Sequence, residues 1–177
     1  DPMCGSGTIL IEGAMMVHNI APGVNRYFSA ERWDVIDEKI WADERNRARD
    51  LVNYDTDFIA YGSDIDEDAI EIAKINAKRA GVERKIKFEK ADIRNFEPKS
   101  EKGTVICNPP YGERLLDIEE AQKLYKIMGE KFIRKHGWSY YVISPSEEFE
   151  KEFGRKADKR RKLYNGMIKC QLFMYFK

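Results

Sequence analysis

The chain has 177 residues, 42% of them hydrophobic and 35% charged, which is enough for one domain with one hydrophobic core. Its 31 basic and 31 acidic side chains cancel, so net charge gives no sign of a nucleic-acid binder. No apolar run approaches the length that crosses a bilayer. Three widely spaced cysteines, Cys4, Cys107 and Cys170, lack metal-ligand spacing. We therefore expect small buried side chains, a reducing cytoplasmic setting and no metal.

The chain opens on a glycine-rich turn, Asp-Pro-Met-Cys-Gly-Ser-Gly-Thr at residues 1–8, which runs into an apolar-periodic segment at residues 9–20. A turn of this kind before a helix is typical of a loop that holds a nucleotide-like cofactor. The periodicity places Ile9, Gly13 and Met16 on one helix face, packed against a sheet. A buried strand should precede such a turn, so we expect a longer chain with a strand and another domain upstream.

A charged and aromatic insertion follows at about residues 22–57. We expect one helix in it, at residues 36–53. Its aromatic side chains could form a substrate platform, but helical spacing of the apolar positions favours a local core. These positions are Trp33, Ile36, Ile40 and Trp41.

Strands and helices alternate in the rest of the chain. We predict strands at residues 58–63, 86–89, 104–107 and 140–144, helices at 68–80 and 118–136, and a hairpin of residues 162–164 and 167–176. Asp66 and Gly81 are the expected caps of the helix at 68–80, and Asn165-Gly166 is a strong hairpin signal. This order predicts an α/β fold with a mostly parallel sheet, covered on both sides and finished by an antiparallel hairpin.

A basic segment at residues 151–162 carries seven Lys or Arg side chains against two acidic ones. It could contact phosphates, or it could be a solvated surface loop. The sequence leaves both interpretations open.

The opening loop differs from the dinucleotide and P-loop patterns. Gly5-Ser6-Gly7 lacks a third glycine, and no lysine follows it. The best ribose-binding acid, Asp64, lies well beyond the roughly twenty positions usual in dinucleotide folds, because the insertion intervenes. A cofactor without a pyrophosphate fits better, and Asp1 could meet the ammonium group of an amino-acid moiety.

Four motifs in this order resemble the class I S-adenosylmethionine-dependent methyltransferases, with a Rossmann-like fold. They are residues 1–8, Asp-Ile-Asp at 64–66, Ala-Asp at 91–92 and Asn-Pro-Pro-Tyr-Gly-Glu-Arg at 108–114. The sequences of these motifs are most similar to those of the THUMP-containing RNA guanine-N2 methyltransferases, whose bacterial members modify 23S ribosomal RNA. Ala-Pro-Gly-Val-Asn-Arg at 21–26 and Lys-Leu-Tyr-Asn-Gly at 162–166 also resemble that family. The resemblance implies S-adenosylmethionine as cofactor, RNA as partner and a THUMP-like domain upstream.

The resemblance also implies roles for single residues. Asp1, Gly5 and Gly7 would cradle the methionine moiety, Asp64 would bind the ribose hydroxyls, and Asp92 would accept from the adenine amino group. The whole implied cofactor set is Asp1, Met3, Gly5, Gly7, Thr8, Asp64, Ile65, Ala91, Asp92 and Asn108. The implied catalytic set is Asn108, Pro109, Pro110 and Tyr111. The implied substrate contacts are Glu113, Arg114, Arg160, Arg161 and Lys162. Asp64 could instead be a helix-entry residue and Asp92 a turn residue.

Asn-Pro-Pro-Tyr suits methylation of an exocyclic amine, which is a poor nucleophile because its lone pair is delocalised into the ring. If the Asn108 side chain and the Pro109 carbonyl accept its hydrogens, the lone pair is freed, and the prolines stiffen the loop. Tyr111 can stack on the base. The chemistry also fits an adenine-N6 DNA methyltransferase, a protein glutamine methyltransferase or a transfer RNA guanine-N2 methyltransferase. A non-catalytic RNA-binding module is the alternative from another class.

Overall fold

The computed structural model describes residues 1–112 and 118–176. Its α-helices are α1 (Thr8–Val17), α2 (Glu38–Asp50), α3 (Glu67–Arg79), α4 (Ile118–Lys131) and α5 (Phe149–Phe153). Its strands are β1 (Ala60–Asp64), β2 (Ile86–Lys90), β3 (Gly103–Cys107), β4 (Trp138–Ser144), β5 (Lys159–Asn165) and β6 (Ile168–Tyr175). Short 3₁₀ helices lie at η1 (Ser29–Arg32), η2 (Glu83–Lys85) and η3 (Ile93–Asn95). The predicted alternation of strands and helices is confirmed, with element ends shifted by a few residues.

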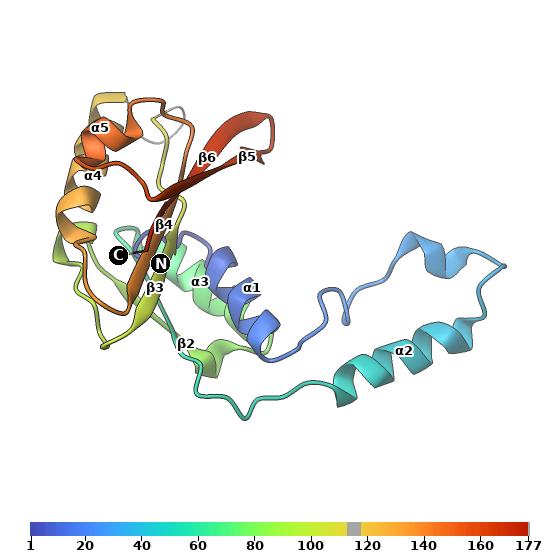
Figure 1. Cartoon of the computed structure of the whole chain (residues 1–177). Helices are drawn as coiled ribbons and strands as arrows, with labels where there is room; N and C mark the ends of the chain where they lie inside the picture. Colours follow the sequence, from blue (N-terminus) through green and yellow to red (C-terminus); the bar gives the residue numbers. More distant parts are fainter. Residues whose placement is uncertain (113–117, 177) are drawn as a thin grey trace.

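The strands form two groups. β1 pairs in parallel with β2, and the second group has the order β3-β4-β6-β5, in which β3 and β4 are parallel and β6 is antiparallel to both neighbours. The first residues of the chain lie against β1, because the Asp1 backbone N donates to the Tyr61 carbonyl at 2.8 Å and Ser63 N donates to the Asp1 carbonyl at 2.9 Å. Met3 packs against the hydrophobic core that contains Cys107 of β3. The opening residues therefore lie between the two groups (Figure 1).

Helix α1 begins directly after Gly7, whose φ of 82° is left-handed. Its buried side chains are Ile11 and Ala14, while Met16 is 80% exposed. The predicted inward face was therefore wrong at Met16. The reason is close packing at the start of the helix, where a Cβ on Gly7 would lie 3.0 Å from the Phe88 ring of β2. A side chain at position 7 would therefore keep the start of α1 from packing this closely on β2.

The predicted caps of α3 are confirmed. The Asp66 side chain accepts from Asp68 N at 2.9 Å, and Gly81 follows the helix with a φ of +74°. Val82 N donates to the Ala77 carbonyl at 3.0 Å, which is the hydrogen bond of a Schellman-type helix end.

The larger hydrophobic core lies between α4, α5 and the β3–β6 group. Helix α4 contributes the buried Tyr125 and Met128, and Phe132 directly after its end is also buried. Helix α5 was not predicted, because its five residues carry only Phe149 and Phe153 as a helical signal within charged sequence. The two phenylalanine rings stack with a centroid distance of 5.2 Å.

The insertion forms an arm that carries η1 and α2 away from the rest of the molecule (Figure 1). No residue of α2 is buried. Phe28 stacks on Trp41 with ring centroids 6.0 Å apart, but Trp33 is 59% and Ile40 is 55% exposed. The local-core interpretation was therefore wrong for Trp33 and Ile40.

The base of the arm is held by His18, which is fully buried. Asn53 N donates to the His18 carbonyl at 2.9 Å, and the His18 Nδ1 lies 2.9 Å from the Asn53 carbonyl. Both ends of the insertion are thus tied together. Among the described residues, no helix is both long and apolar enough to cross a membrane. All three cysteines are buried, as predicted.

Candidate active site

A cavity of about 1310 Å³ lies where β1, β2 and β3 end, facing α4 and the tip of the β5–β6 hairpin. Its lining residues are Pro2, Met3, Gly5, Asp64, Ile65, Asp66, Ala69, Ala91, Asp92, Ile93, Arg94, Asn108, Pro109, Pro110, Tyr111, Glu120, Lys123, Leu124, Ile127, Asn165, Gly166, Met167 and Ile168. Pockets for one small molecule usually measure roughly 300–1,000 Å³. The cavity therefore has room for two ligands side by side.

The opening loop forms one wall of the cavity through Pro2, Met3 and Gly5. Gly5 has a φ of +50°, and a Cβ built on it would meet nothing within 4 Å. Its N–H donates to Asp64 Oδ2 at 2.9 Å. The loop is thus held to the end of β1 and leaves open space above Gly5, where a ligand can approach the backbone.

Asp1, Gly7 and Thr8 do not line the cavity. The Asp1 carboxylate accepts from Met3 N at 3.2 Å, and the Thr8 hydroxyl lies 3.1 Å from that of Ser6. Gly7 packs against Phe88. In this structure the three residues shape the loop and its junction with α1, so the sequence pattern did not separate lining residues from supporting ones.

Asp64 lies at the end of β1 with both carboxylate oxygens engaged. Oδ1 accepts from Asp66 N at 3.1 Å, and Oδ2 accepts from Gly5 N at 2.9 Å. Each oxygen retains a second lone pair, so the group can also accept from a ligand hydroxyl. Ile65, which is exposed, lines the cavity beside it and supplies an apolar surface.

Asp92 follows β2 and begins η3. Its carboxylate accepts from the Arg94 backbone N at 2.8 Å and from the Arg94 side chain at 3.0 and 2.5 Å. The Arg94 guanidinium holds the pKa of Asp92 below its usual value. Asp92 thus stays ionised, and a ligand amino group would donate to the same carboxylate that accepts from Arg94. Sequence reasoning missed Arg94, although its position two residues after the acid was a visible signal.

The Asn-Pro-Pro-Tyr loop follows β3 and forms the opposite wall. Pro109 is fully buried. The Tyr111 hydroxyl donates to Asn108 Oδ1, and the Asn165 side chain donates to the Tyr111 hydroxyl at 3.2 Å. Burial raises the pKa of Tyr111 to about 12, so the phenol remains neutral. The hydrogen-bond chain from Asn108 through Tyr111 to Asn165 joins this loop to the hairpin.

The hairpin tip contributes lining residues that sequence reasoning did not assign to the site: Asn165, Gly166, Met167 and Ile168. Helix α4 adds Lys123, Leu124 and Ile127. The hairpin itself was predicted. The packing of the hairpin tip against the Asn-Pro-Pro-Tyr loop was not predicted, because local sequence does not encode which loop a hairpin packs against.

The predicted substrate contacts divide into two groups. Glu113 and Arg114 lie outside the described residues. Arg160 pairs with Glu150 through two guanidinium nitrogens, one of them at 2.9 Å, and its guanidinium lies 5.6 Å from the centre of the Phe173 ring. Arg161 and Lys162 are exposed on β5. The surface-loop interpretation of residues 151–162 is confirmed in part, since most of them are exposed and 154–158 connect α5 to β5, but the segment also contains the end of α5 and the start of β5.

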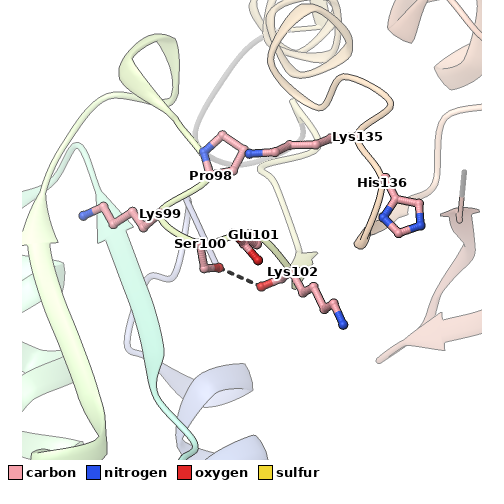
Figure 2. Close-up of a pocket in the computed structure, with 7 residues that line it drawn as sticks. All are labelled: Pro98, Lys99, Ser100, Glu101, Lys102, Lys135 and His136. Carbon is pink, nitrogen blue, oxygen red and sulfur yellow. Dashed lines mark hydrogen bonds between the residues drawn. The ribbon is translucent and has the colours of Figure 1, made fainter.

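A second hollow, of about 590 Å³, lies among residues that precede β3 and β4. Figure 2 shows its lining residues, with the Ser100 hydroxyl donating to the Lys102 carbonyl at 2.7 Å. Because β3 and β4 are parallel, this hollow lies at the opposite end of these strands from Asn108. It shares no residue with the larger cavity and is not part of the candidate active site.

The chain is similar to known proteins over nearly its whole length. The family described as "RMKL-like, methyltransferase domain" matches residues 1–173. The chain is 43% identical over 176 residues to "Putative RNA methyltransferase YpsC" of Bacillus subtilis (strain 168), covering 99% of the chain and 46% of that protein. It is 40% identical over 180 residues to "Ribosomal RNA large subunit methyltransferase K/L" of Shewanella sp. (strain W3-18-1), covering 99% of the chain and 25% of that protein.

A similar solved structure is that of SMU.472, titled "a putative methyltransferase complexed with SAH". It superposes with a TM-score of 0.93 at 44% identity, over 99% of this chain and 47% of that one. The fold is therefore the class I methyltransferase fold, as predicted. The chain spans less than half the length of the two curated relatives. Because the family match covers nearly the whole chain, the chain belongs to the RMKL-like methyltransferase domain family.

Proposed function

We propose that this domain transfers a methyl group from S-adenosylmethionine to the exocyclic N2 amino group of a guanine in RNA, with ribosomal RNA as the substrate. The observation that carries the proposal is the shared cavity. One of its walls is formed by Gly5, Asp64 and Asp92, and another by Asn108 and Tyr111. A cofactor and a base bound at these walls would face each other directly.

The first wall fits the cofactor. Open space above Gly5 admits the methionine moiety, and the fixed Asp64 carboxylate can accept from the ribose hydroxyls. Ile65 and Ile93 line the cavity on the way to Asp92 and offer apolar contact to an adenine ring. The bound cofactor supplies an electrophilic methyl group. S-adenosylhomocysteine in the homologous SMU.472 structure supports this assignment.

The second wall fits a planar base that carries an amino group. Asn108 Oδ1 and the Pro109 carbonyl would accept the two amine hydrogens and so release the nitrogen lone pair for attack. The buried Pro109 holds these acceptors in place, and catalysis then consists mainly of positioning. Tyr111 would stack on the base. Its hydroxyl now bonds to Asn108 Oδ1, so the amine must displace it.

RNA is favoured over the other substrates by the names of the relatives, which specify RNA and the large ribosomal subunit. The cationic side chains beside the cavity, on β5 and β6, also suit a polyanion. Adenine N6 in DNA and a glutamine amide in protein present similar amines and remain the alternatives, together with guanine N2 in transfer RNA. A purely RNA-binding module would not require a cavity of this size with the side chains of Asp64, Asp92 and Asn108 in its walls. We further propose that an RNA-binding domain of the THUMP kind, elsewhere in the full protein, delivers the RNA.

Methyl transfer from labelled cofactor tests the proposal with the full-length protein. Undermethylated ribosomal RNA, transfer RNA, DNA and release-factor protein serve as parallel substrates, and the products are digested to nucleosides or amino acids. We expect label on guanine N2 of ribosomal RNA. Label on adenine, or on protein alone, would contradict the guanine assignment, and the absence of label on every substrate would contradict the enzyme assignment.

A further inference from the structure

The β5–β6 hairpin ends in a two-residue turn that presents a methionine. Asn165 and Ile168 are the last paired residues, so Gly166 and Met167 form the turn. Gly166 has a φ of +59°, and Asn19 is the one non-glycine residue with a positive φ in the described part of the chain. This combination fits a turn with glycine at its first central position. It leaves the Met167 side chain 98% exposed.

An exposed tyrosine lies one position before the paired end of the same hairpin. Tyr164 is 62% exposed and pairs across the strands with Lys169. The Lys162 Nζ lies 5.2 Å from the centre of the Tyr164 ring. Neither Lys162 nor Lys169 forms an ion pair with a described residue. One aromatic ring with two available cations therefore lies on a single face of the hairpin, since directly paired residues share a face.

The hairpin tip is continuous with the proposed base pocket. Asn165, Met167 and Ile168 line the same cavity as the Asn-Pro-Pro-Tyr loop. The Asn165 side chain donates to the Tyr111 hydroxyl at 3.2 Å, and Cys170 Sγ of β6 lies 3.8 Å from the same oxygen. Tyr164 and Lys169 lie on the opposite face of the hairpin from Asn165 and Ile168, since successive strand residues alternate between faces. A nucleotide strand that passes over the tip to deliver a base to Tyr111 would therefore meet both faces.

We propose that the β5–β6 hairpin grips the RNA strand beside the target nucleotide. Met167 fills the space that the target base leaves when it turns into the pocket, and Tyr164 stacks on a neighbouring base. Lys162 and Lys169 meet the adjoining phosphates. This inference rests on the proposed function for its target base, but the contact of Tyr164 with RNA does not require catalysis.

Chemistry favours RNA over a protein partner at this face. An apolar side chain inserted at a base step is a known way to hold an unstacked strand, and enzymes that act on a base must take it out of its stack. Aromatic stacking tolerates any base, because every base has a π face. A protein-binding patch would need a wider apolar surface than one methionine and one tyrosine among cations.

Two measurements on the full-length protein test the inference. The first is binding of a single-stranded RNA of about ten nucleotides, followed by fluorescence anisotropy. Tyr164→Ala should weaken binding by about 5- to 150-fold, as loss of one stacked base implies, whereas Tyr164→Phe should keep nearly all of the affinity. Lys169→Ala should weaken binding and reduce its dependence on salt.

The second measurement compares methylation of one guanine presented in a base-paired stem and in a flexible single strand. Met167→Ala should lower kcat/KM on the stem by about tenfold and on the flexible strand by less than about twofold, because only the stem requires unstacking. Met16→Ala is the matched control, since Met16 is also highly exposed but lies on α1 away from the cavity. It should change neither rate.

The two assays separate the failure of each idea. If the wild-type protein methylates neither RNA but Tyr164→Ala still weakens RNA binding, the proposed function fails and the hairpin contact stands. If methylation proceeds and the Tyr164 and Met167 variants match the wild type in both assays, the hairpin inference is overturned and the proposed function stands.

Discussion

Replacing Tyr111 by phenylalanine tests the geometry of the base pocket most directly. The Tyr111 hydroxyl donates to Asn108 Oδ1, which is the atom proposed to accept from the target amine. A neutral hydrogen bond contributes a net of about 0.5–1.5 kcal/mol. Because Tyr111→Phe removes the competing donor and keeps the ring for stacking, kcat/KM should rise by about 2- to 12-fold. The Asn165 amide loses its partner but lies exposed, so water replaces that bond.

Asn108→Ala should have the opposite effect. It removes the acceptor for an amine that gains positive charge as it attacks, and hydrogen bonds to charged groups contribute about 1.5–3 kcal/mol. We expect kcat to fall by about 10- to 150-fold, while cofactor affinity changes by less than about twofold.

Steady-state rates with labelled cofactor, and calorimetric titration with S-adenosylhomocysteine, measure these two quantities. If Tyr111→Phe is about tenfold slower than the wild type, the hydroxyl assists the reaction instead of competing for Asn108. If Asn108→Ala abolishes cofactor binding, the division of the cavity into two walls is wrong.

Three further predictions concern the cofactor site, packing and pH. Asp64→Asn should weaken S-adenosylhomocysteine binding by at least about tenfold in calorimetry, and an unchanged affinity would remove Asp64 from the ribose site. Gly129→Ala places a Cβ 1.9 Å from the Phe153 carbonyl oxygen, so urea unfolding should show a loss of about 2–3 kcal/mol. In the control Gly13→Ala, the added Cβ meets nothing within 4 Å, so the free energy of unfolding should rise by up to about 1 kcal/mol. Equal effects of the two substitutions would refute the packing argument. Burial raises the pKa of the Cys4 thiol from 9.0 to about 11. The pKa of the thiol in the folded state lies above that in the unfolded state, so the buried neutral thiol contributes fully to the free energy of unfolding below pH 9. This contribution falls by up to about 2 kcal/mol as the pH rises to 11. In urea unfolding at a series of pH values, Cys4→Ala should flatten the fall in the free energy of unfolding between pH 9 and 11. An unchanged dependence on pH would contradict the prediction.

Local patterns in the sequence determined the order of elements and the loops that carry the chemistry. Helical and strand periodicities extend over neighbouring residues, so β1, α3 and α4 could be predicted, as could the caps of α3. The glycine-rich loop and Asn-Pro-Pro-Tyr were visible because backbone constraints of glycine and proline act locally.

Only the tertiary structure decided which of these side chains meet. It turned Gly7 toward Phe88 instead of the cavity and paired Arg160 with Glu150. It also placed the β5–β6 hairpin tip beside Tyr111, through Asn165. Such contacts join residues far apart in the chain, and they depend on how whole elements pack, which no local spacing encodes.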